Sequence, residues 1–312
     1  MIAERGGDLT PEQAQAAIAA WLGRDVGPVS LRRLTGGCVY TVLEATFCAP
    51  ESPVVFKVAA LPGDDGLVAE HFTLSYLHRH GLLRVPRPLA CDVSGAQLPV
   101  SYLAMERLPG VNMGQAAGAL SAGQREQLER EMGEAVARLH LHTGRGFGLL
   151  AEGASFASWT DWFRRLLVEQ FEENVGIGLL ASAALAKVEQ LIGKLPEILE
   201  EPPAPTLVHG DIWSANVMVD PNGGRLLSGF LDPAGVFADP EYELAYLELW
   251  RSVGPAFLRA YHAVHPRRPG YETRRQVYWL NTLLLHVWFF RQQQYVDGTE
   301  RVLDGLSGAV GL

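Results

Sequence analysis

The spacing of hydrophobic residues changes near residues 108–110 (LPG), and this change limits the folds open to the chain. Before it, apolar residues occur in short runs typical of β-strands, separated by Gly- and Pro-containing turns, at residues 39–42, 54–58, 89–93 and 102–107. Beyond it, stretches such as 128–139 and 185–195 repeat with a helical period. The chain is therefore expected to consist of a β-rich part followed by a helical part.

Two helices are expected within the β-rich part. Thr10, Pro11 and Gln13 match a capped helix start, and Gly23 can end that helix. A second helix is expected at 67–80, with one buried face made up of Val68, Phe72, Tyr76 and Leu77. We therefore predict an α+β, bilobal fold, with a small antiparallel sheet lobe and a helix in residues 1–107 and a larger helical lobe in 108–312.

One β-hairpin is expected inside the helical part. A short strand at 206–208 precedes a polar loop, and two apolar runs at 217–219 and 226–231 flank the turn sequence DPNGG. Helices are expected to resume after Pro233 and to continue to the end.

Charge and cysteine content argue against several classes of protein. The formal net charge of −9 disfavours a nucleic-acid binder, because the phosphate backbone requires clustered Lys and Arg. Three irregularly spaced cysteines fit neither a disulfide framework nor a zinc site. The first residues do not resemble a targeting peptide, and no apolar run approaches about 20 residues, the length that spans a bilayer. A cytoplasmic protein without a membrane partner is expected.

Candidate catalytic residues surround the predicted hairpin. Asp211 and Asn216 follow the strand at 206–208, and Asp232 directly follows the apolar run that ends the hairpin. Phosphoryl transfer uses such a set: one carboxylate accepts the proton of the attacking hydroxyl, while a second carboxylate and an amide oxygen hold Mg²⁺. We predict Asp211 as the base and Asn216 with Asp232 as metal ligands. The alternative is that each of these residues only forms a turn, which is the usual role of a lone Asp or Asn at a strand end.

Lys57 is the complementary candidate in the β-rich part. It lies within an apolar β-run, where a lysine needs an anionic partner, and Glu70 on the following helix can supply one. A strand lysine paired with a helix glutamate contacts ATP phosphates in kinases. The alternative is an exposed lysine on an edge strand and a solvated glutamate.

Two other segments fit a nucleotide. Gly36 and Gly37 lie where a phosphate-covering turn would be, although most Gly-Gly pairs are plain turns. Met105, Glu106 and Leu108 precede the expected hinge, where backbone groups can bind adenine. The chain contains no P-loop motif.

The motifs resemble those of the fructosamine kinase (ketosamine 3-kinase) family, within the aminoglycoside phosphotransferase and choline kinase group of protein-kinase-like folds. The resemblance rests mainly on residues 209–217 (HGDIWSANV), 231–234 (LDPA) and 239–245 (DPEYELA). It implies ATP-dependent phosphorylation of a sugar hydroxyl of a ketosamine, with Mg²⁺. Some members carry a redox-sensitive cysteine in the phosphate loop, where Cys38 lies; a small buried cysteine is the alternative.

The resemblance also implies an acceptor site. Trp213, Asp239 and Glu241 would lie near it, because aromatic faces suit a sugar and carboxylates suit its hydroxyls or ammonium. Glu241, Glu243 and Glu248 can instead belong to a solvated helix start, where acids favour the helix dipole. Another small-molecule kinase, acting on an aminoglycoside, choline or another amino alcohol, and a non-catalytic nucleotide-binding pseudokinase remain alternative functions; a protein kinase is a more remote one.

Overall fold

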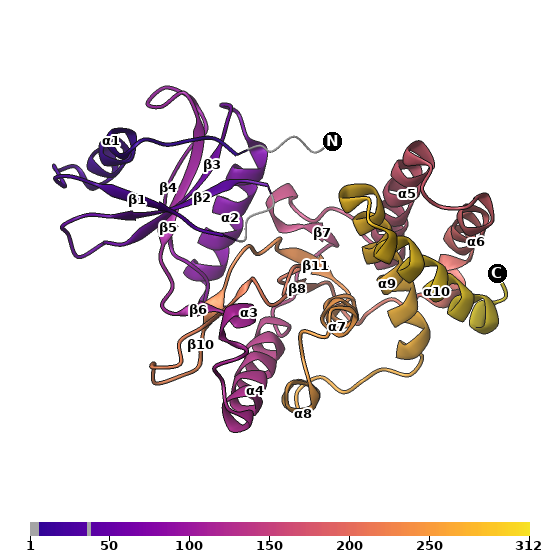
Figure 1. The fold of residues 1–312 in the computed structure, drawn as a ribbon. Helices are drawn as coiled ribbons and strands as arrows, with labels where there is room; N and C mark the ends of the chain where they lie inside the picture. Colours follow the sequence, from indigo (N-terminus) through magenta and orange to yellow (C-terminus); the bar gives the residue numbers. More distant parts are fainter. Residues whose placement is uncertain (1–5, 36–38) are drawn as a thin grey trace. The chain divides into compact units, whose positions relative to one another are not determined.

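A computed structural model describes residues 6–35 and 39–312 of the chain. Its contacts divide the chain into two compact units (Figure 1). The first unit contains the described residues up to Gln124 together with Ser214–Pro233, and the second contains Arg125–Trp213 and Ala234–Leu312. The predicted hairpin therefore belongs to the first unit, and the division of contacts differs from the boundary predicted at residue 107.

The first unit is built on an antiparallel sheet. The sheet has the strand order β1-β2-β3-β5-β4, and every neighbouring pair is antiparallel, as predicted. The elements of this unit are α1 (Pro11–Leu22), β1 (Ser30–Arg33), β2 (Thr41–Thr46), β3 (Val54–Ala59), α2 (Asp65–Arg79), β4 (Pro88–Asp92), β5 (Ser101–Glu106), β6 (Val111–Asn112), α3 (Met113–Ala116), β9 (Val217–Val219) and β10 (Leu227–Phe230).

Helix α1 has the ends that its sequence predicts. Thr10 and Gln13 form a reciprocal capping box, and Gly23 closes the helix in a left-handed conformation. The buried face of α1, which includes Ile18, packs into a core that β3 and β5 share through Phe56 and Tyr102. The helix thus covers part of the sheet.

Helix α2 buries a different face from the predicted one. Leu67, Leu74 and Leu77 are buried, whereas the side chains of Val68 and Phe72 are 44% and 48% exposed. The expected face was therefore wrong apart from Leu77. Both stripes repeat with a helical period, so the sequence alone does not determine which of them packs on the strands.

A second sheet of the first unit has the order β10-β9-β6. The predicted hairpin is confirmed, since β9 and β10 pair antiparallel, and β6 pairs with β9 on its other side. Gly110 makes the second pairing possible, because a Cβ there would lie 2.0 Å from the carbonyl oxygen of Val219.

The second unit is mainly helical. Its elements are α4 (Ala122–Leu139), which begins at the boundary, β7 (Gly148–Leu149), the 3₁₀ turn η1 (Leu150–Glu152), α5 (Trp159–Ile177), α6 (Ser182–Ile198), β8 (Thr206–Val208), β11 (Val236–Ala238), α7 (Pro240–Leu249), α8 (Pro255–His262), α9 (Tyr271–Phe290) and α10 (Gln293–Val310). Strand β11 pairs with both β7 and β8. The expectation that only helices follow Pro233 was wrong, because β11 is too short to show a period and forms through its neighbours.

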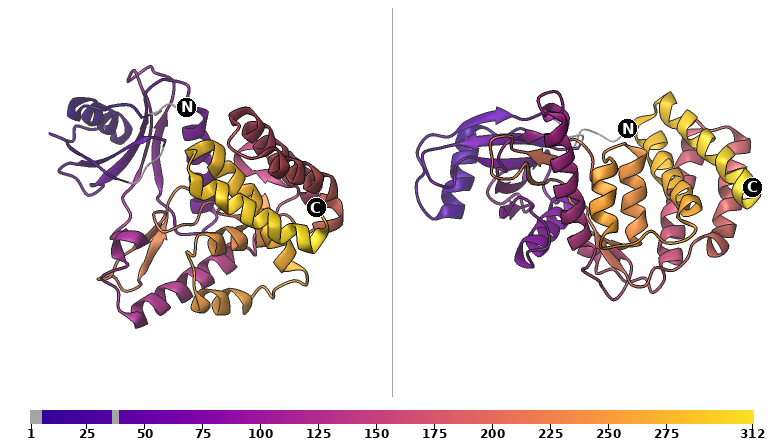
Figure 2. Two further views of the ribbon diagram at one scale, coloured as in Figure 1. Left: turned by 45° about the vertical axis from the view of Figure 1, so that its right-hand side comes forward. Right: turned by 90° about the horizontal axis from the view of Figure 1, so that it is seen from below.

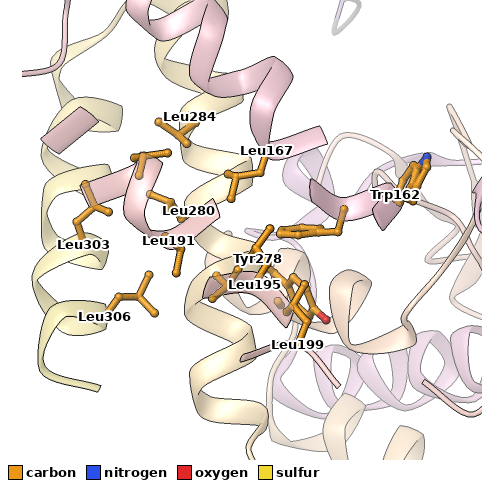
Figure 3. Packing of buried hydrophobic residues seen from close by; sticks show 14 of the residues in the cluster. Trp162, Leu167, Leu191, Leu195, Leu199, Tyr278, Leu280, Leu284, Leu303 and Leu306 are labelled. Atoms are coloured by element: carbon orange, nitrogen blue, oxygen red, sulfur yellow. The ribbon is translucent and has the colours of Figure 1, made fainter. Parts of the chain in front are cut away.

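The core of the second unit lies among α5, α6, α9 and α10. Leu167 of α5, Leu191 of α6, Leu284 of α9 and Leu303 of α10 belong to one buried cluster (Figure 3). Helices α9 and α10 run side by side in every view (Figures 1 and 2). No helix in the described part of the chain combines the length and apolar character needed to span a bilayer.

Candidate active site

Lys57 is the centre of a buried charge cluster in the first unit. The residue is 7% exposed on β3. Its Nζ lies 2.7 Å from Glu70 Oε1, 2.8 Å from Glu70 Oε2 and 2.7 Å from Asp232 Oδ1. The predicted pairing of Lys57 with Glu70 is confirmed, and the alternative of an exposed edge-strand lysine is wrong.

The cluster keeps Lys57 charged. Burial alone would lower the pKa of the Lys57 ammonium, but the charges of Asp232 and Glu70 outweigh it and raise that pKa above its ordinary value. Burial raises the pKa of the Glu70 carboxyl, and the positive charge of Lys57 opposes that rise. A fixed cation is therefore held between two acidic side chains.

Asn216 and Asp232 are joined by the hairpin backbone. The Leu231 N–H donates to the Asn216 carbonyl oxygen at 2.8 Å, which holds the loop after β8 beside the end of β10. Asp232 has a φ of 57°, a left-handed value that Asp tolerates better than most residues. The Asp232 side chain is 42% exposed, so it can reach a ligand.

These residues line one cavity of about 590 Å³, a size that suits a small-molecule ligand. The cavity is lined by Lys57, Asn216, Asp232, Met105, Glu106 and Leu108, among others, and by Thr35, the last described residue before Gly36. The structure thus brings the candidate residues predicted for this unit to one cavity. Gly36, Gly37 and Cys38 lie outside the described residues.

The segment before the predicted hinge already has local partners. The Glu106 carboxylate accepts hydrogen bonds from Arg84 Nη2 at 2.7 Å and from the Arg87 N–H at 3.1 Å. The Glu106 N–H donates to the Arg87 carbonyl oxygen. Adenine binding by Met105, Glu106 and Leu108 stays a prediction.

Asp211, in the second unit, is oriented by a residue that the sequence interpretation missed. The Tyr246 hydroxyl donates to Asp211 Oδ1 at 2.5 Å. Burial, and then the nearby charge of Asp211, raise the pKa of the Tyr246 phenol, so this group stays protonated and acts as a donor. Tyr246 thereby fixes the direction of the carboxylate predicted to be the base.

Glu243 holds the backbone in front of Asp211. Its carboxylate accepts hydrogen bonds from the Gly210 N–H at 2.7 Å and the His209 N–H at 3.3 Å, and lies 2.8 Å from His140 Nε2. Burial raises the pKa of the Glu243 carboxyl, but the His140 contact and these donors outweigh it, and the pKa is lowered.

The solvated-helix alternative is wrong for Glu241 and Glu243, which are 5% and 1% exposed. Glu243 and Tyr246 are three residues apart on α7, which places them on one face of the helix. This spacing was the available sequence signal for a helix face turned toward the loop that carries Asp211.

Asp239 and Glu241 belong to a buried ion network at the start of α7. Arg268 Nη2 lies 2.5 Å from Asp239 Oδ2 and 2.9 Å from Glu241 Oε2, and Arg274 Nε lies 2.7 Å from Glu241 Oε2. Tyr278 also donates to Asp239. Both carboxylates thus have partners, and their acceptor-binding role, like that of half-buried Trp213, stays a prediction.

The donor chemistry of the cavity fits a magnesium ion. Asn216 and Asp232 both line it and offer hard oxygen atoms, and Mg²⁺ is usually held by one or two protein ligands together with phosphates and waters. No group of three or more His, Cys, Asp or Glu in the described residues could hold a metal ion by itself.

The sheet unit, the helical unit and the cluster around Lys57 define a protein of kinase-like fold. A sequence model of the fructosamine kinase family matches residues 11–307. The chain therefore belongs to the fructosamine kinase family.

Related sequences agree with this assignment. A probable ketoamine kinase of Synechocystis is 29% identical, over 82% of this chain and 83% of its own. The ketosamine-3-kinase of Mus musculus is 29% identical, over 75% of this chain and 71% of its own. A probable ketoamine kinase of Escherichia coli K12 is 30% identical, over 78% and 82%.

Solved structures agree on the fold. A candidate fructosamine-3-kinase from Haemophilus somnus superposes with a TM-score of 0.73 at 18% identity, covering 95% of this chain and 97% of its own. An aminoglycoside phosphotransferase solved with ADP and hygromycin B gives a TM-score of 0.67 at 19% identity, covering 96% and 99%.

Proposed function

We propose that the protein is an ATP-dependent kinase that phosphorylates a sugar hydroxyl of a ketosamine, a sugar joined to an amine by glycation. The observation that carries the proposal is the Lys57 cluster in a cavity that Asn216 and Asp232 also line. Family membership and the names of the related proteins support the choice of acceptor.

The cavity of the first unit is proposed to bind ATP. Lys57, kept charged by its partners, contacts the phosphates, and Glu70 keeps its ammonium in place. Asn216 and Asp232 would hold Mg²⁺. Bound there, the ion would offset negative charge on the phosphate oxygens.

Asp211 is proposed to accept the proton of the acceptor hydroxyl. The hydroxyl oxygen forms a bond to the γ-phosphorus, the bond from that phosphorus to the β–γ bridging oxygen breaks, and ADP leaves with the bond's electrons. Tyr246 keeps the Asp211 carboxylate in one orientation during proton transfer. Trp213, two residues after Asp211, is proposed to offer an aromatic face to the sugar.

Measurement of ADP release tests this function. We expect turnover with fructosyl-lysine or ribulosyl-lysine, whereas turnover of kanamycin or choline alone would refute the ketosamine assignment. The second candidate, an aminoglycoside kinase, is favoured only by similarity of fold. Asp211→Asn should abolish turnover while ATP still binds; full activity in that variant would refute the choice of base.

A further inference from the structure

A hollow of about 600 Å³ lies at the C-terminal end of α7, against α9 and α10. Its lining includes Trp250 and Arg251 after α7, Arg275 and Trp279 of α9, and Arg301 of α10. We call it the arginine pocket. It lies entirely within the second unit, and it is separate from the cavity that contains Lys57.

The arginine pocket is cationic although the whole chain carries a net charge of −9. Glu248 is its one acidic lining residue, and it is 2.5 Å from Arg275 Nη1. Arg275 also pairs with Glu272. Within residues 6–35 and 39–312, Arg251 and Arg301 form no ion pair, and both are exposed. Two positive charges in the pocket thus lack a protein carboxylate.

Aromatic side chains complete the walls of the arginine pocket. The rings of Trp250 and Tyr295 meet edge to face with centroids 6.1 Å apart. The Arg275 guanidinium lies 4.6 Å from the centroid of the Trp279 ring. Aromatic faces beside cationic groups suit a ligand that has both a sugar ring and a negative charge.

A short chain of contacts connects the arginine pocket to the predicted base. Trp250, the residue that directly follows α7, is four residues after Tyr246, and their ring centroids are 6.2 Å apart. Tyr246 in turn donates its hydrogen bond to Asp211. The arginine pocket thus includes a residue, Trp250, whose ring lies next to the tyrosine that orients Asp211.

We propose that Arg251 and Arg301 bind an anionic group, a carboxylate or a phosphate, carried by the acceptor. The inference rests on the proposed function and narrows its substrate class: ketosamines with an acidic group are preferred over neutral ones. The same charges disfavour polycationic acceptors such as aminoglycosides, because like charges would then face one another. Arg251 and Arg301 are thus specificity-determining residues.

Matched acceptors test the proposal. Values of kcat/KM are measured for fructosyl-glycine, for its amide, which lacks the carboxylate but keeps the same amine, and for the amide with a 6-phosphate. In the wild type we expect kcat/KM for at least one of the two acceptors with an anionic group to exceed that of the amide by about tenfold or more, the usual effect of a hydrogen bond to a charged group. The ratio should fall toward one in Arg251→Gln/Arg301→Gln.

The ratio of two acceptors cancels a general loss of activity in the double variant. Arg259→Gln is the matched control, because Arg259 is an exposed arginine of the same unit that pairs with Glu126 away from the pocket. It should keep the wild-type ratio. A preference confined to the carboxylate or to the phosphate identifies the source of the anion.

A wild-type ratio near one for both anions would overturn the proposal, and so would a preference that the double variant keeps. Calorimetric binding of fructosyl-glycine and its amide separates this inference from the proposed function. If no ketosamine is phosphorylated, the proposed function fails. In that case, fructosyl-glycine that binds more tightly than its amide, with the difference lost in the double variant, still supports the anion site in the arginine pocket. Equal binding of the two compounds overturns it.

Discussion

Substitution of Glu243 is the most direct test of how the loop that carries Asp211 is held in place. Its carboxylate, 1% exposed, meets three donors: the His209 and Gly210 N–H groups and His140 Nε2. A buried donor left without a partner costs about 1–3 kcal/mol, so the loss of all three contacts in Glu243→Ala should lower the free energy of unfolding by about 3–9 kcal/mol. Glu243→Gln keeps one acceptor and should lower it by about 1–3 kcal/mol.

The Glu243→Gln variant should also be slow. A shift of Gly210 moves the neighbouring Asp211, and small misplacements of a catalytic group lower rates by about 10- to 100-fold. We expect that loss in kcat, with the KM for ATP changed by less than about twofold, because the proposed ATP cavity belongs to the first unit. ADP release and urea unfolding measure the two effects.

The stability effect of Glu243 should depend on pH. Its folded-state pKa is lowered, so its contribution is complete above the unfolded pKa of about 4.3 and is lost as the pH falls through the folded pKa. The difference in unfolding free energy between wild type and Glu243→Gln should therefore be constant from pH 6 to 8 and shrink below about pH 4. A difference that grows on acidification would contradict the sign.

Glu201→Gln is the control for the Glu243 experiment. Glu201 also accepts two backbone N–H groups, from Trp159 at 2.8 Å and Thr160 at 2.9 Å, but these are at the start of α5. This variant should lose stability and keep its kcat. Equal losses of kcat in the two variants, or an unchanged kcat in Glu243→Gln, would refute the positioning role.

Three other substitutions give separate tests. Lys57→Met should lower kcat/KM for ATP by about 100-fold or more, and an unchanged value in a steady-state ATP titration would contradict phosphate binding by Lys57. Tyr246→Phe should lower kcat by about tenfold while KM for both substrates stays within about twofold; a loss confined to KM would argue against orientation of Asp211. Gly110→Ala should destabilise the protein by about 2–4 kcal/mol in urea, because its Cβ would meet the Val219 carbonyl oxygen and its φ is 84°, and an unchanged midpoint would refute the close approach.

The features that the sequence predicts well depend on neighbouring residues. The capping box of α1 and the β9–β10 hairpin are specified by short motifs, and both are found. The pairing of Lys57 with Glu70 was predicted because an isolated lysine in an apolar strand requires a nearby partner.

The features that were missed depend on residues far apart in the chain. Strand β11 exists because it pairs with β8, about thirty residues earlier. Glu243 and Tyr246 read as ordinary helix residues until the fold places them beside Gly210 and Asp211. The contact of Asp232 with Lys57 also joins distant segments. The sequence therefore predicted both residues as site residues but did not predict that they contact each other.

Because β6 pairs with β9, the first unit needs residues that the ribosome adds only about a hundred positions later. Asn216 and Asp232, which line the cavity, lie at the two ends of the β9–β10 hairpin and are synthesised with it. A fragment that stops at Gln124 would leave β6 without its partner and the cavity open on one side. The cavity is therefore completed only after much of the helical unit has been synthesised.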